Sequence, residues 1–187
     1  MSTRLRLGWG VGMVLLLTGA SHYPAAGQQF PGFGGLEVRS GAYWPENAKR
    51  GYGVAGDLDL GGLRFAHVRP IVGIHYFSAD VDAGPAGDAG RYAAYGGRAG
   101  LRLLLPRMAA IRPHIVAALT GTSVAADLED PRTSELLGGF YLGADLGAGL
   151  SWALTPGERL AMVGEVRRML ASNIDRYGLE VGLRYTL

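Results

Sequence analysis

The sequence alternates between apolar and polar residues with a period of two, and the alternation is unbroken in the last ten residues, GLEVGLRYTL. Successive side chains of a β-strand point to opposite faces, so the pattern predicts a strand with one apolar and one polar face. The apolar positions are Leu179, Val181, Leu183, Tyr185 and Leu187. The residues of the second face are Gly178, Glu180, Gly182, Arg184 and Thr186.

The first residues have the composition of a secretory signal peptide. Arg4 and Arg6 precede an uncharged apolar stretch over residues 7–20, and residues 25–27 (Ala-Ala-Gly) place small side chains before a cleavage site at Gln28. The apolar stretch contains glycines and is shorter than the roughly 20 residues that span a bilayer. We therefore predict a cleaved signal peptide over 1–27, in preference to a membrane anchor.

The remaining 160 residues (28–187) suffice for one domain, which we place at 35–187 after a short lead-in at 28–34. Cleavage removes two arginines and leaves 16 basic against 16 acidic groups, so the net charge is about zero. No basic patch for nucleic acid is expected. The chain has no Cys, which excludes disulfides, thiolate metal sites and thiol nucleophiles.

Seven further segments alternate like the terminal one, which makes eight. They cover residues 35–44, 51–61, 64–79, 91–105, 111–124, 135–154, 159–170 and 178–187. None has a sustained helical period, so the fold class is all-β. Segments of about ten alternating residues separated by turns are the signature of a membrane barrel. We predict an eight-stranded antiparallel up-and-down transmembrane β-barrel.

The connections between these segments alternate in length. Gly61-Gly62 and residues 155–157 (Thr-Pro-Gly) form tight turns, and residues 106–110 a modest one. Residues 80–90 and 125–134 are longer and rich in Gly, Asp or Pro. With both ends of the domain in the periplasm, the short connections are periplasmic and the long ones face outside.

The alternation alone would also fit a lipocalin-like barrel, whose apolar face points inward. Here the polar parity is crowded with Gly and Ala, and its charges are Arg, Asp and Glu, which can pair, whereas the only lysine is Lys49. Aromatic residues gather near both ends of the segments on the apolar parity, as membrane interfaces favour. They are Trp44, Tyr52, Tyr76, Tyr95, Phe140 and Tyr177 toward one rim, and Trp152 and Tyr185 toward the other. We expect the apolar face to meet lipid.

The polar parity places twelve charged side chains in the lumen. They are Glu37, Arg39, Asp57, Asp59, Arg69, Arg98, Arg102, Asp145, Glu165, Arg167, Glu180 and Arg184. Eight strands leave an interior just wide enough for side chains. Buried arginines and carboxylates must pair, so we expect a plug of ion pairs. The alternative is a selective path for ions or protons.

Two short motifs add to this pattern. Glu180, Gly182, Tyr185 and Leu187 match the C-terminal insertion signal of small outer-membrane barrels, with Leu187 where Phe is usual. Residues 69–73 (RPIVG) and 112–116 (RPHIV) open two segments in similar ways, and a proline is tolerated near a strand start. Over residues 33–187 the chain resembles the small eight-stranded outer-membrane barrel family, which includes the OmpA transmembrane domain and the OmpX-like and OmpW-like proteins.

The resemblance implies location in the outer membrane of a Gram-negative-type bacterium, insertion by the barrel-assembly machinery, and contact with outer-membrane lipid and lipopolysaccharide. We expect a structural or surface-interaction role without catalysis, and the sequence names no surface partner. The alternative is a porin-like narrow channel or a conduit for small hydrophobic molecules, as OmpW-like relatives suggest. Tyr43, Tyr92 and Tyr141 lie on the lumen parity near the outer end, where such a conduit would need an apolar funnel.

A lipid-modifying barrel enzyme would need Ser, His and an acid close together near the membrane face. The serines on the lipid parity are Ser40, Ser78 and Ser123, whereas His67, His75 and His114 fall on the polar parity. We therefore expect no catalytic residues. We also expect no metal or cofactor, because another segment separates the strands of His67 and His114, and because residues 127–130 (DLED) lack the ligand spacing of a calcium loop.

The exported protein should begin near Gln28. N-terminal sequencing of the protein recovered from the cell envelope checks this expectation. Recovery of the chain with Met1 retained would contradict the prediction of a signal peptide.

Overall fold

The computed structural model describes residues 33–45, 49–61, 67–81, 90–128, 134, 138–171 and 175–187. The predicted signal peptide and most of the predicted lead-in lie outside these residues. The elements are β1 (Gly35–Pro45), β2 (Gly51–Asp59), β3 (Val68–Val81), β4 (Gly90–Leu104), β5 (Ile111–Leu128), β6 (Gly139–Ala153), the 3-10 turn η1 (Pro156–Glu158), β7 (Leu160–Ala171) and β8 (Arg176–Thr186). No helix among the described residues is long and apolar enough to cross a membrane.

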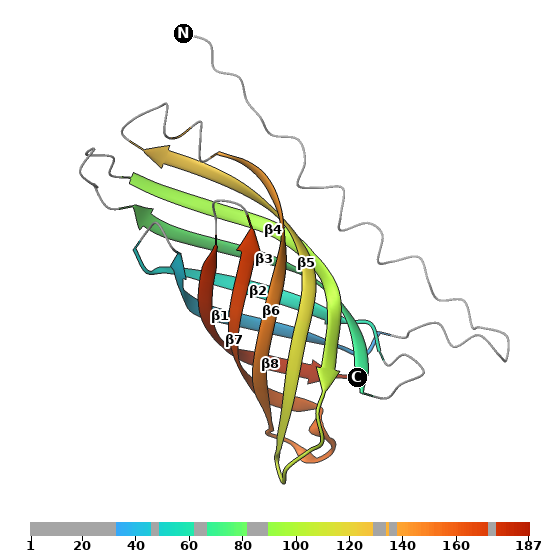
Figure 1. Ribbon diagram of the computed structural model, residues 1–187. Helices are drawn as coiled ribbons and strands as arrows, with labels where there is room; N and C mark the ends of the chain where they lie inside the picture. Colours follow the sequence, from blue (N-terminus) through green and yellow to red (C-terminus); the bar gives the residue numbers. More distant parts are fainter. Residues whose placement is uncertain are drawn as a thin grey trace, which may run out of the picture. The chain divides into compact units, whose positions relative to one another are not determined.

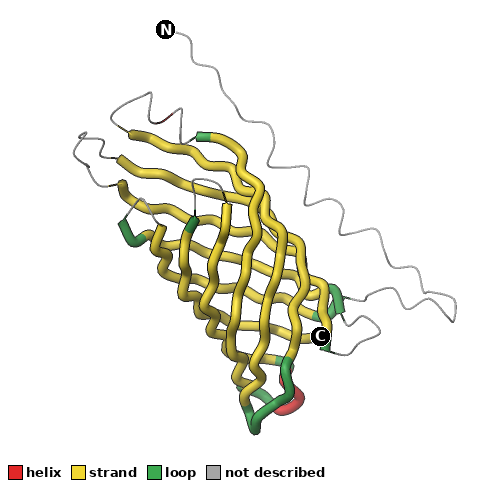
Figure 2. Tube along the Cα trace, in the orientation of Figure 1, coloured by secondary structure: helices red, strands yellow, loops and turns green. Residues whose placement is uncertain are grey.

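The eight strands form one closed barrel in sequence order (Figures 1 and 2). Each strand pairs antiparallel with the next, and β8 closes the barrel against β1 with Leu36 opposite Tyr185 and Tyr43 opposite Gly178. This confirms the predicted all-β, up-and-down, eight-stranded fold. Closure gives every strand two neighbours, so none of the eight described strands is an edge strand of an open sheet.

The apolar parity points outward along the barrel. On β6, Leu142 and Leu146 are 75% and 47% exposed, whereas Asp145 between them is 7% exposed. The aromatic residues predicted for the two rims are all exposed in the same way. A lipocalin-like barrel would show the reverse, with apolar residues inside, so that alternative is wrong for this chain.

The first and last described residues of the chain lie at the same end of the barrel. The backbone amide of Gly34 donates to the Asp59 carbonyl at 2.7 Å, and that of Leu187 donates to the Gly34 carbonyl at 3.1 Å, so the two ends of the barrel domain lie together. We call this the inner end. Two short turns also lie here, around Met108, which forms a bridge with Ile111, and at η1. The opposite end is the outer end.

Some strand limits differ from the sequence prediction toward the outer end. β5 continues to Leu128 and β3 to Val81, into segments predicted as loops. Polar residues do not stop a strand there, because opposite charges face each other across the ladder. Asp80 lies opposite Arg91, and Arg91 opposite Asp127. β8 also begins two residues earlier than predicted, at Arg176, which pairs with Pro45.

Turn geometry sets the other differences. β2 ends at Asp59, two residues before the predicted limit, because Gly61 has a positive φ of 83° and its amide donates to the Asp59 carboxylate at 2.9 Å. β6 begins at Gly139, where the sequence pattern predicted residue 135, and the Gly138 amide next to it donates to the Ser134 carbonyl at 2.9 Å. Residues 135–137 lie outside the described residues.

The two faces of β6 should respond oppositely to polar substitution. Leu146 lies on the outward face, so Leu146→Arg should cost about 2–4 kcal/mol of folding free energy if it lies near a bilayer midplane. The neighbouring Gly147 faces the lumen, where an added Cβ would meet the Arg167 side chain at an ordinary 3.4 Å. Gly147→Ser should therefore be tolerated better than Leu146→Ser. Folding into lipid vesicles measures both, and the reverse order would contradict the assignment of the faces.

Candidate functional site

The lumen holds nearly all the charged side chains that the polar parity placed there. Eleven of the twelve are less than a tenth exposed, and we call these eleven the charged core. They are Glu37, Arg39, Asp57, Asp59, Arg98, Arg102, Asp145, Glu165, Arg167, Glu180 and Arg184. The twelfth, Arg69, is half-buried at the inner end, with a quarter of its side chain exposed.

Arg39 is the hub of the charged core. From β1, its Nε donates to Glu180 of β8 at 2.6 Å and its Nη2 donates to Asp57 of β2 at 2.9 Å. Its Nη1 donates to Glu37 and lies 3.4 Å from Glu165 of β7. One guanidinium thus joins four carboxylates from four strands, which only a narrow lumen permits.

Arg98 crosses the barrel between strands that are not neighbours. Its Nε and Nη2 donate to the two oxygens of Asp57 at 2.8 Å each, a bidentate pair from β4 to β2. Its Nη1 donates to Asp145 of β6 at 3.0 Å. Arg102, two lumen positions further along β4, donates to Glu37 on β1 at 2.9 Å. These contacts fill the lumen from wall to wall.

The remaining carboxylates are shared in the same way. Arg167 donates to Asp145 at 3.1 Å and to Glu165 at 3.2 Å. The second oxygen of Glu165 lies 2.7 Å from Nε2 of His114, and Nε2 of His75 lies 3.1 Å from the hydroxyl of Thr122. Both histidines therefore have hydrogen-bonding partners inside the lumen.

Small residues make room for these long side chains. Gly182 lies opposite Arg39 across the β1–β8 pair, and a Cβ there would lie 2.7 Å from Cγ of Arg39, too close for two carbon atoms. Gly149 similarly faces His114, and a Cβ there would lie 2.8 Å from its Nε2. The glycines on the polar parity thus leave room for the side chains of arginine and histidine, as expected from the sequence.

An apolar layer closes the lumen toward the outer end. The rings of Tyr43 and Phe77 meet edge to face with centroids 5.1 Å apart, and Phe77 meets Tyr92 at 5.4 Å. The guanidinium of Arg176 lies 4.8 Å from the Phe77 ring centroid and 5.1 Å from that of Tyr43. We call these four residues the aromatic cap. Met169 is buried in the same cluster.

The sequence pattern did not single out Phe77 or Arg176 as residues of the lumen. Phe77 shares its parity with His75, so the alternation did carry the signal that it faces the lumen. Arg176 lay outside the predicted last strand, which began two residues later. Arg176 makes no ion pair with any carboxylate among the described residues, and its contacts are with the two rings.

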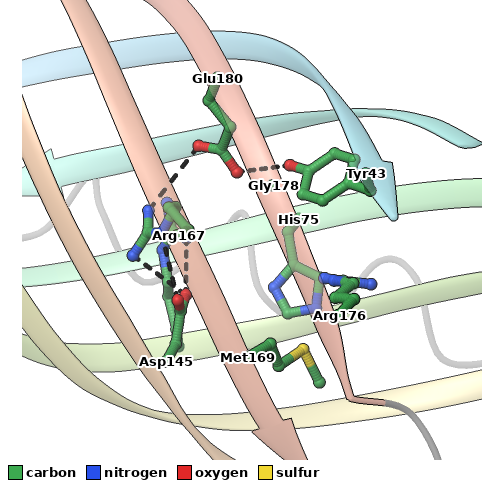
Figure 3. Close-up of a pocket in the computed structure, with 9 residues that line it drawn as sticks. Tyr43, His75, Asp145, Arg167, Met169, Arg176, Gly178 and Glu180 are labelled. Carbon is green, nitrogen blue, oxygen red and sulfur yellow. Dashed lines mark hydrogen bonds and ion pairs between the residues drawn. The ribbon is translucent and has the colours of Figure 1, made fainter. Parts of the chain in front are cut away.

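Little space remains between the aromatic cap and the charged core. Figure 3 shows Glu180 between the Tyr43 hydroxyl, which donates to it, and Arg167, with Asp145 on the other side of Arg167. The cavity among these side chains has a volume of about 10 Å³, lined also by His75 and Arg176. Such a volume holds about one water molecule.

The residues considered for other chemistry do not come together. Ser40 is exposed and Ser78 and Ser123 are half-buried on the outward parity, and no hydrogen bond joins them to a histidine of the described residues. His67 is exposed at the start of β3. Within the described part of the chain, no group of three or more potential ligands could hold a metal ion. Of the acidic segment 127–130, residues 129 and 130 lie outside the described residues.

Removal of one carboxylate should show how far the core depends on pairing. Asp57→Asn removes the negative charge of a carboxylate that both Arg39 and Arg98 contact. It should destabilise the barrel by about 3–5 kcal/mol. The matched control is Asp80→Asn, whose pair with Arg91 is exposed and should contribute less than about 1 kcal/mol. Denaturant unfolding in detergent measures both changes. Equal effects would contradict a core held by buried pairing.

Comparison with protein-family models and with curated protein sequences gives no match. Solved structures match the fold. Neisserial surface protein A has a TM-score of 0.59 at 14% identity, with 82% of this chain and 96% of that chain covered. Ail of Yersinia pestis, in a complex with a heparin analogue, has a TM-score of 0.47 at 12% identity, with 82% and 99% covered. The N-terminal barrel domain of Pseudomonas aeruginosa OprF has 0.47 at 12%, with 83% and 99% covered. The likeness to the neisserial protein confirms the resemblance to small outer-membrane barrels at the level of the fold.

Proposed function

We propose that this chain is an integral outer-membrane β-barrel protein with a structural or surface-interaction role, a closed lumen and no catalytic activity. The observation that carries the proposal is the charged core, in which arginines such as Arg39 and Arg98 contact carboxylates on several strands at once. A lumen filled by paired side chains supports a scaffold for surface loops better than it supports a pore.

The outward face supports placement in a membrane. Large apolar side chains are exposed on every strand, for example Val54 on β2, Leu119 on β5 and Val181 on β8. Contact of this apolar surface with water would cost free energy. Lipid removes that cost, and the exposed aromatic residues at the two rims suit the interfaces. Contact with lipid and lipopolysaccharide follows from this placement, and export by the predicted signal peptide is part of the same proposal.

The C-terminal residues support insertion by the barrel-assembly machinery. Tyr185 and Leu187 are exposed on the outward face, whereas Glu180 is buried in the lumen. The motif therefore has apolar residues on the outer surface and a charged residue inside the barrel. Gly182 also has a packing role beside Arg39. The surface partner of the barrel is left open by this proposal.

The absence of catalysis rests on the separation of the candidate groups. The serines lie on the outward parity, and His75 and His114 are bonded inside the lumen. A nucleophile and its base must be within hydrogen-bond reach of each other, and here the barrel wall lies between them.

A second candidate function is a conduit for small hydrophobic molecules. The aromatic cap favours it, because Tyr43, Phe77 and Tyr92 line the outer end of the lumen with apolar surface. The charged core beneath the cap argues against passage through the barrel, since an apolar solute would have to displace paired charges. The closed scaffold is therefore the better supported function.

Planar-bilayer recordings test the closed lumen. The native protein should show no stable porin-like steps, and Phe77→Ala should behave like the native protein, because it opens the cap but leaves the charged core. Arg39→Ala should raise the conductance, because it removes the hub that fills the centre. Heat-modifiable mobility on gels confirms that each variant is folded.

Large, stable steps from the native protein would contradict the closed scaffold. A rise in conductance with Phe77→Ala alone would identify the aromatic cap as the barrier and favour the conduit.

A further inference from the structure

The inner end of the lumen contains a second cavity, much larger than the one beneath the aromatic cap. Its volume is about 220 Å³, which is large enough to hold several water molecules. We call it the inner cavity. The charged side chains that line it are Asp59, Arg69, Arg112, Glu158 and Arg184, and the hydroxyl side chains are Ser151 and Thr186.

Three arginines reach the inner cavity from three separate strands. Arg69 lies at the start of β3, Arg112 at the start of β5 and Arg184 near the end of β8. Two carboxylates, Asp59 and Glu158, line it with them. The lining therefore carries one more positive than negative charge.

The two carboxylates are already engaged. One oxygen of Asp59 accepts from Nη1 of Arg69 at 3.1 Å, and the other accepts from the Gly61 amide at 2.9 Å. Glu158 pairs with Arg112 at 3.1 Å through one oxygen and with Arg107 through the other. Each oxygen of these two carboxylates thus already has a donor, and the third arginine, Arg184, pairs with Glu37 outside the lining.

Two guanidinium nitrogens of the arginines that line the inner cavity have no hydrogen-bond partner among the described residues. They are Nε of Arg69 and Nη2 of Arg184, and both atoms are buried. Arg184 is only 8% exposed, and its one bond is from Nε to Glu37 at 2.6 Å, an acid that Arg39 and Arg102 also use. A buried donor without a partner costs about 1–3 kcal/mol, so an acceptor at this position would be favoured.

We propose that the inner cavity binds a small soluble oxyanion of the phosphate class. An anion offsets the excess positive charge of the lining, and guanidinium groups bind oxyanions with paired N–H donors. The arginines come from three strands around the ring, so their donors approach from different directions. A tetrahedral oxyanion presents oxygens in those directions, whereas a carboxylate presents two oxygens in one plane.

The position of the inner cavity decides how such an ion reaches it. The lining residues face the lumen, and the aromatic cap and charged core close the lumen on the outer side. The ion therefore enters from the water at the inner end. Because a quarter of the Arg69 side chain and a third of that of Arg112 are exposed, the binding should weaken as the ionic strength rises.

Titration of inorganic phosphate into the folded protein in detergent micelles tests the proposal. At constant ionic strength, the backbone amide signals of Ser151 and Ala161, which line the cavity, should shift and saturate. Chloride and acetate should not produce the same saturable shift. Arg69→Gln should weaken phosphate binding by roughly tenfold or more, the effect of losing a charge-assisted hydrogen bond.

The matched control is Arg91→Gln, which removes an exposed arginine at the outer end and should leave phosphate binding unchanged. If Arg69→Gln fails to fold, Arg112→Gln removes a more exposed arginine from the same cavity and should weaken binding similarly. Shifts that do not saturate, equal binding of acetate, or equal effects of the inner-end and control substitutions would overturn the proposal.

Discussion

The pairing of arginines with carboxylates inside a narrow lumen is the interaction on which the rest of this barrel depends. Charges removed from water are stable only when partners surround them, and eight strands bring opposite walls close enough for one arginine to reach several acids. Arg39 and Arg98 each contact carboxylates on more than one other strand, so the pairs also tie distant strands together. With the charged side chains paired inside, the outer face is left to apolar side chains.

The lumen is not uniform along its length. Toward the outer end, Tyr43, Phe77 and Tyr92 exclude water and hold the buried Arg176 against their rings, where a cation–π contact takes the place of a carboxylate. Toward the inner end, arginines outnumber the acids around a larger cavity. The space inside the barrel is therefore uneven, with a cavity of about 10 Å³ beneath the aromatic cap and one of about 220 Å³ at the inner end.

Much of this fold could be predicted from the sequence, because the period of two is a property of the extended backbone. The alternation identified eight strands, the outward face and the lumen position of residues as distant as Glu37 and Arg184. It failed at strand ends. β5 extends to Leu128 because ladder pairing with β4 continues through polar residues, and a pattern of hydrophobicity does not report such pairing.

The sequence by itself determined which face each side chain takes, since that follows from parity alone. Only the tertiary structure decided which charge meets which. Asp57 and Asp145 are 41 and 47 residues from Arg98, and they meet it because barrel closure and register bring β2, β4 and β6 around one narrow lumen. The same closure left Arg176 with aromatic rings and gathered Arg69, Arg112 and Arg184 at one cavity. Parity carries no information about distances across a barrel, so these partners could be found only in the folded chain.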